Sequence, residues 1–157
     1  MSAAVTPSSP PASATPVPVQ ALFVLATEVG EADIDMLGHA SNIAYLRWVQ
    51  DVAVAHSAAV GLDMEGYSQL GAVFVVRRHE IDYMLPALLD DRIELLTHVE
   101  SWKGASSERK TRIVRLRDGA ELARAHTRWA YVSIETGRPT RIPAELQRAF
   151  GFTPRVK

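Results

Sequence analysis

The sequence predicts one α+β domain in which a curved antiparallel β-sheet of about five strands wraps around one long helix. A chain of 157 residues allows one domain of ordinary size. Only one stretch, which begins at Asn42, spaces its apolar residues by three and four, as a long amphipathic helix does. Most of the chain after Gly71 alternates apolar and polar residues, and the short turns between its strands favour antiparallel neighbours.

Residues 1–20 are expected to form a disordered or extended tail, so that the folded domain spans residues 21–152. The tail holds five of the nine prolines, and Glu28 is the first charged residue of the chain. A secretory signal would need a basic segment followed by a longer apolar run than this region contains. We therefore expect a cytoplasmic protein.

The first strand is expected over residues 22–29, where β-branched and aromatic residues are frequent, and a loop follows as far as His39. The long helix is expected to begin with Ser41 or Asn42 as its N-cap and to stop at Gly61, which suits the C′ position. The many alanines of this helix permit close packing against a sheet.

The elements after the long helix are expected to follow one another closely, beginning with a glycine-containing connection at 66–71. Four further strands are expected at 73–83, 93–100, 108–117 and 121–134, and a short helix at 143–150. Asp118-Gly119 is the strongest hairpin signal in the chain. Apolar residues such as Leu96 and Val114 would remain on the outer face of the sheet, which predicts burial against a second copy.

Composition and motifs exclude several classes of function. The net charge of −1 gives no basic footprint for nucleic acid, and no apolar run approaches the roughly 20 residues that span a membrane. The absence of cysteine removes disulfides, thiolate zinc sites and cysteine nucleophiles. The five histidines are too far apart for a local metal signature, and no G-x-S-x-G, P-loop or dinucleotide motif is present. We therefore expect no metal and no bound cofactor.

The segment before the long helix contains the residues best suited to catalysis. Asp33 and Asp35 precede the expected helix start, and a helix N-terminus exposes unpaired N–H groups that can hold a carbonyl oxygen. Gly38 would let a substrate approach the main chain closely. The alternative interpretation is that the acids are ordinary helix caps and that His39 is a surface residue.

The spacing Asp35-Met36-Leu37-Gly38-His39-x2-Asn42-x2-Tyr45-Leu46-x-Trp48 resembles the signature of hotdog-fold acyl-CoA thioesterases of the 4-hydroxybenzoyl-CoA thioesterase type. The resemblance covers nearly all of residues 22–150. It implies a hotdog fold, a sheet wrapped around one long helix, which agrees with the pattern of elements above. It also implies hydrolysis of an acyl-CoA to the free acid and coenzyme A, with coenzyme A as part of the substrate and no other cofactor.

Carried over residue by residue, the resemblance makes Asp35 the catalytic carboxylate, acting as nucleophile or as general base for water. Asn42 would offer its backbone N–H to the thioester carbonyl, and Gly38 would allow close approach. His39 would assist as base or donor. The chain reads Gly-His-Ala-Ser-Asn from Gly38, where relatives often read Gly-His-Val-Asn-Asn.

The resemblance further implies an active site between subunits of a dimer or a tetramer. Lys103, Arg138 and Arg141 are the candidates for binding the phosphates of coenzyme A, and Arg109 and Lys110 are further candidates. Tyr45 either contacts substrate or packs the helix onto the sheet. Two alternatives stay open: an acyl-carrier-protein thioesterase, and a hotdog protein that binds acyl-CoA without turnover.

Overall fold

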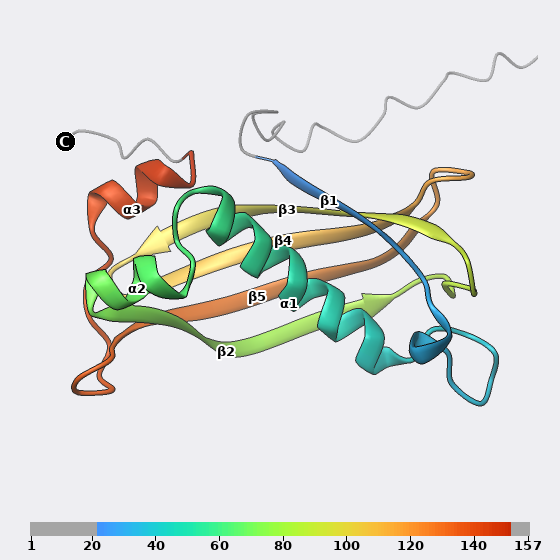
Figure 1. Ribbon diagram of the computed structural model, residues 1–157, viewed down its shortest axis with the longest axis horizontal. Coiled ribbons are helices and arrows are strands. Elements are labelled where there is room, and N and C mark those ends of the chain that lie inside the picture. The colour runs from blue at the N-terminus through green and yellow to red at the C-terminus, as the bar shows by residue number, and fades with distance from the viewer. Residues whose placement is uncertain (1–21, 152–157) are drawn as a thin grey trace, which may run out of the picture.

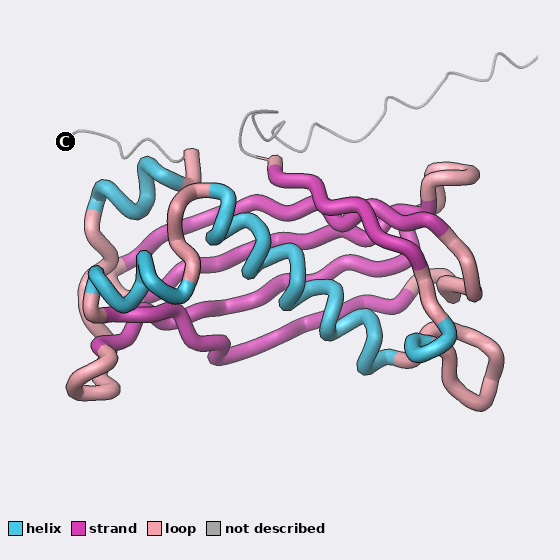
Figure 2. Tube along the Cα trace, viewed as in Figure 1, coloured by secondary structure: helices cyan, strands magenta, loops and turns pink. Residues whose placement is uncertain are grey.

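The computed structural model describes residues 22–151, so the tail expected at 1–20 lies outside the described residues. A five-stranded antiparallel sheet curves around helix α1 (Asn42–Ala59), as Figures 1 and 2 show. The strands are β1 (Phe23–Glu28), β2 (Ala72–Tyr83), β3 (Arg92–Lys103), β4 (Ser106–Arg115) and β5 (Glu121–Ser133), and the shorter helices are α2 (Met64–Leu70) and α3 (Ala144–Ala149). The predicted α+β hotdog architecture is confirmed.

The strands lie in the order β1-β3-β4-β5-β2, and every neighbouring pair is antiparallel. Short turns join β3, β4 and β5 into a meander, as expected. The expectation that short connections make all successive strands neighbours is wrong for β2 and β3, because β2 pairs with β5 at the opposite edge. The chain between Tyr83 and Arg92 is long enough to cross the end of the sheet.

Helix α1 has the predicted boundaries because both of its ends are capped. The Ser41 side chain accepts a hydrogen bond from the Ala44 N–H at 3.2 Å. At the other end Gly61 adopts a φ of 86°, a left-handed conformation that favours glycine. The capped helix buries Trp48 and Val52 against the concave face of the sheet.

Helix α2 was not expected, because residues 66–71 read as a glycine-containing connection. Asp63 caps this helix by accepting from the Gly66 N–H at 2.8 Å, and Gly71 ends it in the left-handed conformation. Gly66 is a packing requirement here, since a Cβ at this position would lie 2.4 Å from the Gly61 carbonyl oxygen. Together α2 and α3 cover the end of the sheet beside the C-terminus of α1 (Figure 1).

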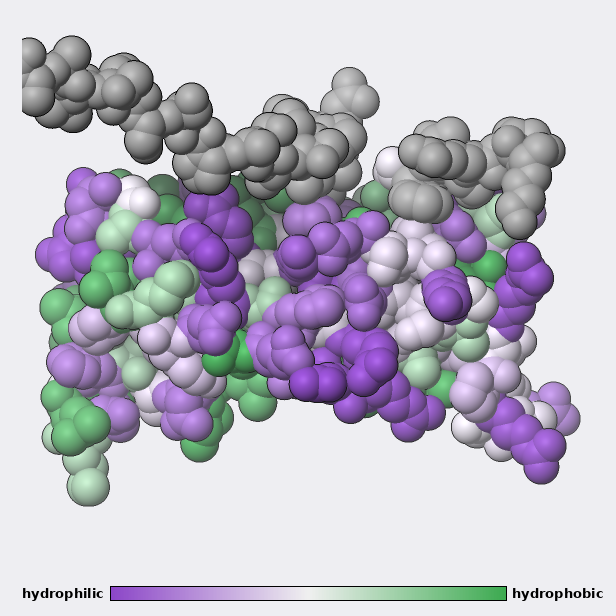
Figure 3. Space-filling view, turned by 180° about the vertical axis from the view of Figure 1, so that it is seen from behind, coloured by the Kyte–Doolittle hydropathy of each residue, from purple (hydrophilic) through white to green (hydrophobic). Residues whose placement is uncertain are grey.

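The outer face of the sheet carries Leu96 and Val114, as expected, but its centre is polar. Leu96 and Val114 are only partly exposed, and the centre of this face is hydrophilic (Figure 3). Its strands carry charged and polar side chains there: Glu80, Glu108, Lys110, Arg112, Arg124 and His126. Burial of this face against a second copy stays a prediction. No helix within residues 22–151 is long and apolar enough to cross a membrane.

Candidate active site

The two neighbouring acids before α1 have different roles in the structure. Asp33 is buried, and it accepts hydrogen bonds from the Gly30 N–H at 2.9 Å and from the guanidinium of Arg47. Its own carbonyl accepts from the Ser41 N–H at 2.8 Å. Asp33 therefore holds the loop against the start of α1 and is not available to a substrate.

Asp35 is exposed at the tip of a tight turn. Its Oδ1 accepts from the Leu37 N–H at 2.8 Å, and its carbonyl accepts from the Gly38 N–H at 3.0 Å. The turn closes with the Asp35 N–H donating to the His39 carbonyl at 2.9 Å, and Gly38 has a φ of 77° that disfavours any side chain. Within the described chain Oδ2 of Asp35 accepts no hydrogen bond, so it is free to meet a ligand.

The first turn of α1 lies directly after this loop. Asn42 and Ile43 are exposed in this turn, and His39 is exposed at the end of the loop. The backbone N–H groups of Asn42 and Ile43 have no acceptor among residues 22–151. The expected combination of an exposed carboxylate and unbonded helix N–H groups is therefore present, and an anion or carbonyl oxygen is the ligand that such N–H groups favour.

Hydrogen bonds to residues 85–87 hold the loop and the start of α1 in place. The Ala40 N–H donates to the Ala87 carbonyl at 2.9 Å. The Tyr45 hydroxyl donates to the Leu85 carbonyl at 3.1 Å and accepts from the Ala87 N–H at 2.8 Å. Because Tyr45 is only 3% exposed and its hydroxyl is already bonded, the structure shows it in the packing role, and the substrate contact has no support.

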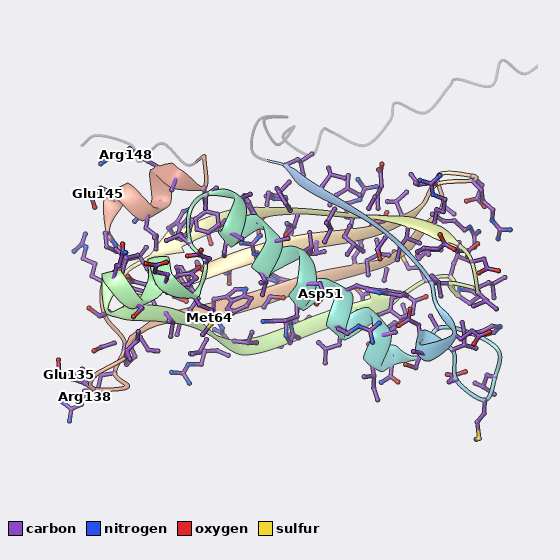
Figure 4. The ribbon with its side chains drawn as sticks, in the orientation of Figure 1. Asp51, Met64, Glu135, Arg138, Glu145 and Arg148 are labelled. Carbon is purple, nitrogen blue, oxygen red and sulfur yellow. The ribbon has the colours of Figure 1, made fainter. Side chains whose placement is uncertain are left out.

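The cations proposed for coenzyme A lie far from Asp35 in a single chain. Lys103, Arg138 and Arg141 are exposed, and Figure 4 shows Arg138 at the end of the molecule opposite the loop that precedes α1. Helix α1, about 27 Å long at 1.5 Å per residue, lies between the two ends. One chain therefore does not bring these cations and Asp35 together.

Apolar side chains gather around the Asp35 end instead. Met36, Leu37 and Ile43 are 102%, 79% and 70% exposed. Figure 3 shows hydrophobic residues concentrated at one end of the molecule and few in its centre. Exposed apolar residues in such number are typical of a surface that another molecule covers.

One candidate cation is buried. Arg109 is 5% exposed beneath the C-terminal half of α1, where it cannot reach the surface phosphates of coenzyme A. Sequence reasoning missed its position because Arg109 lies on the inner face of β4 between the polar residues Ser107 and Thr111, and the apolar Ile113 comes only later on that face. It lines a cavity that is described below.

One group of potential metal ligands lies on the outer face, distant from the Asp35 turn in the fold. The ligand atoms of Glu100, Glu108 and His126 are within 4.8 Å of one another among the described residues. His126 also lies beside Glu80, with its Nδ1 4.0 Å from a carboxylate oxygen. Cross-strand charge pairing accounts for this group without an ion.

The comparisons with known proteins agree with the observed fold. The family model of the thioesterase-like superfamily matches residues 29–150. No match was found among curated proteins. A structure from Lactobacillus plantarum, described provisionally as an oleoyl thioesterase, is 21% identical with a TM-score of 0.79. The match covers 87% of this chain and 55% of the Lactobacillus chain, so this chain spans about half the length of that protein.

Two further structures resemble the whole domain. The 1,4-dihydroxy-2-naphthoyl-CoA thioesterase Slr0204 from Synechocystis is 18% identical with a TM-score of 0.76, over 83% of this chain and 96% of that one. The probable thioesterase YbaW from Escherichia coli is 19% identical with a TM-score of 0.70, over 80% and 94%. At these identities the structures establish a shared fold. The family match over most of the chain, on the fold that the sequence predicted, shows that this protein belongs to the thioesterase-like superfamily.

Proposed function

We propose that the protein is an acyl-CoA thioesterase that hydrolyses an acyl-CoA thioester to the free acid and coenzyme A. The observation that carries the proposal is the exposed Asp35 carboxylate, held by its own turn beside the unbonded N–H groups of α1. Membership of a thioesterase superfamily supports the reaction class. The reaction needs water but no metal or other cofactor.

In the proposed mechanism the thioester carbonyl oxygen accepts the Asn42 N–H, where the helix dipole stabilises the negative charge that develops. Gly38 allows the substrate to approach the main chain. Asp35 either attacks the carbonyl carbon, giving a mixed anhydride that water then cleaves, or removes a proton from an attacking water. In both cases the C–S bond breaks and the departing thiolate takes a proton, for which we propose His39 as the donor.

We further propose that the active unit contains two copies of the chain, in a dimer or within a tetramer. Two copies packed in opposite directions would bring Asp35 of one chain to the end of the other that carries Lys103, Arg138 and Arg141. The same packing would cover the exposed apolar residues around the Asp35 turn and exclude water from it. Strand β2 has a free edge for such pairing, since among the strands of residues 22–151 its hydrogen-bonded neighbour is β5 alone.

Release of free thiol from acyl-CoA tests the proposal. We expect wild type to hydrolyse at least one of benzoyl-CoA, a short-chain acyl-CoA and a long-chain acyl-CoA, also after dialysis against EDTA. Asp35→Asn is expected to lower kcat by about 100- to 10,000-fold, the usual contribution of such a group. Asp51→Asn is the matched control, because Asp51 is an exposed acid on α1 (Figure 4) that lies outside the proposed site.

Three outcomes would replace the proposal. Hydrolysis only when the acyl group is carried by an acyl-carrier protein would make the chain a carrier-protein thioesterase. Tight binding of acyl-CoA without thiol release would make it a non-catalytic binding protein. A full rate in Asp35→Asn would move the catalytic residue elsewhere. The cytoplasmic location stays a prediction from composition.

A further inference from the structure

A cavity of about 300 Å³ lies between the C-terminal half of α1, helix α2 and the concave face of the sheet. Its walls are mainly apolar and include Leu62, Phe74 and Val99. A volume of this size is at the lower end of the range for small-molecule sites. Along α1, Asn42 and His56 are about 21 Å apart at 1.5 Å per residue, so within one chain the cavity is separate from the Asp35 turn.

The cavity contains a buried positive charge that lacks a negative partner. Nη1 of Arg109 donates to Nδ1 of His56 at 2.9 Å and to Oγ1 of Thr97 at 3.2 Å. Burial, and next the charge of Arg109, lower the pKa of His56 to about 4, so His56 is neutral and accepts through Nδ1. Burial lowers the pKa of Arg109 to about 10, so its guanidinium keeps its charge at neutral pH. No carboxylate oxygen of residues 22–151 lies within 4.0 Å of it.

Two tryptophans in the wall of the cavity also have unbonded donors. Trp102 and Trp129 line it, and the buried indole N–H of each has no hydrogen-bond acceptor among the described residues. Asp63, an acid at the rim, is already used as the cap of α2. Buried charges are normally compensated by an opposite charge, and a buried guanidinium whose partners within residues 22–151 are all neutral, at the wall of an apolar cavity, favours a ligand that brings acceptor oxygens and negative charge.

We propose that this cavity binds a small carboxylic acid with an apolar body, whose carboxylate pairs with Arg109. Nη1 is already used by His56 and Thr97, so a carboxylate would pair with the parallel N–H groups of Nε and Nη2. The apolar walls accept a short alkyl chain or a single aromatic ring. An inorganic anion would leave those walls unfilled. The site does not depend on the proposed hydrolysis, although that reaction releases an acid of the same class.

Calorimetric titration with octanoate near neutral pH tests this site, with octanamide as the uncharged counterpart. We expect octanoate to bind wild type and to bind Arg109→Met about 10- to 100-fold more weakly, the usual loss when a charged hydrogen-bond partner is removed. Octanamide is expected to bind wild type more weakly by a similar factor. Arg112→Met is the matched control, because Arg112 lies on the same strand but is exposed on the outer face.

Two additional variants keep the test decisive. Ala58→Trp, at an exposed position on the rim, is expected to block octanoate binding without touching Arg109, which covers the case in which Arg109→Met does not fold. Asp35→Asn is expected to bind octanoate as wild type does, whatever its effect on hydrolysis. Equal affinity for octanoate and octanamide, unchanged binding by Arg109→Met, or no binding of octanoate at millimolar concentrations would each overturn the proposal.

Discussion

The buried contact between His56 and Arg109 predicts a pH-dependent stability that one substitution should remove. The native pKa of His56 is lowered from 6.5 to about 4, chiefly by burial. Between these values the unfolded chain binds a proton that the native protein does not, so stability is present above pH 6.5 and is lost as the pH falls toward 4. From the two pKa values, His56 contributes a loss of about 2 kcal/mol between pH 8 and pH 5.

Urea unfolding at pH 8 and pH 5 measures this loss in wild type and in His56→Gln. Glutamine keeps a side-chain oxygen that can accept from Arg109 but does not titrate. Burial also lowers the pKa of His79 and of His98, so wild type has further pH dependence, and the difference between the two proteins isolates His56. Equal losses in wild type and His56→Gln, with unchanged m values, would refute the reasoning.

Two further changes test contacts that position the elements. Tyr45→Phe leaves the Ala87 N–H without its acceptor and is expected to lower the free energy of unfolding in urea by about 1–3 kcal/mol. Tyr83→Phe, at an exposed position, is the control and should leave that free energy nearly unchanged. Equal effects of the two substitutions would contradict the role of the Tyr45 hydroxyl. Gly66→Ala is expected to lower Tm, because its Cβ would lie 2.4 Å from the Gly61 carbonyl oxygen. An unchanged Tm would mean that α2 packs less closely than described.

Local patterns predicted the local structure well. The three- and four-residue spacing after Asn42 located α1 because that helix buries one apolar face along its length. The Asp118-Gly119 signal located the hairpin between β4 and β5, where Gly119 has a φ of 70°. The turn at Asp35 and Gly38 is likewise a local device, fixed by hydrogen bonds within five residues.

Features that depend on distant contacts could not be predicted from the same patterns. The position of β2 beside β5 depends on packing across the whole sheet. Helix α2 was missed because Gly66, in its first turn, is unfavourable in isolated helices and is explained by the nearby Gly61 carbonyl. The separation of Arg138 from Asp35 could not be predicted either, because spacing along the chain does not show at which end of the folded domain each residue lies.

The hydrogen bonds that anchor the Asp35 turn to Ala87 lower the entropic cost of binding a ligand at this turn. Ala40 and Tyr45, on either side of the start of α1, are both hydrogen-bonded to Ala87. The backbone that carries Asp35 is therefore ordered when the domain folds, and a ligand does not have to supply that ordering when it binds. Interaction energy at this carboxylate remains available for stabilising the reacting group itself, which is the physical meaning of a preorganised site.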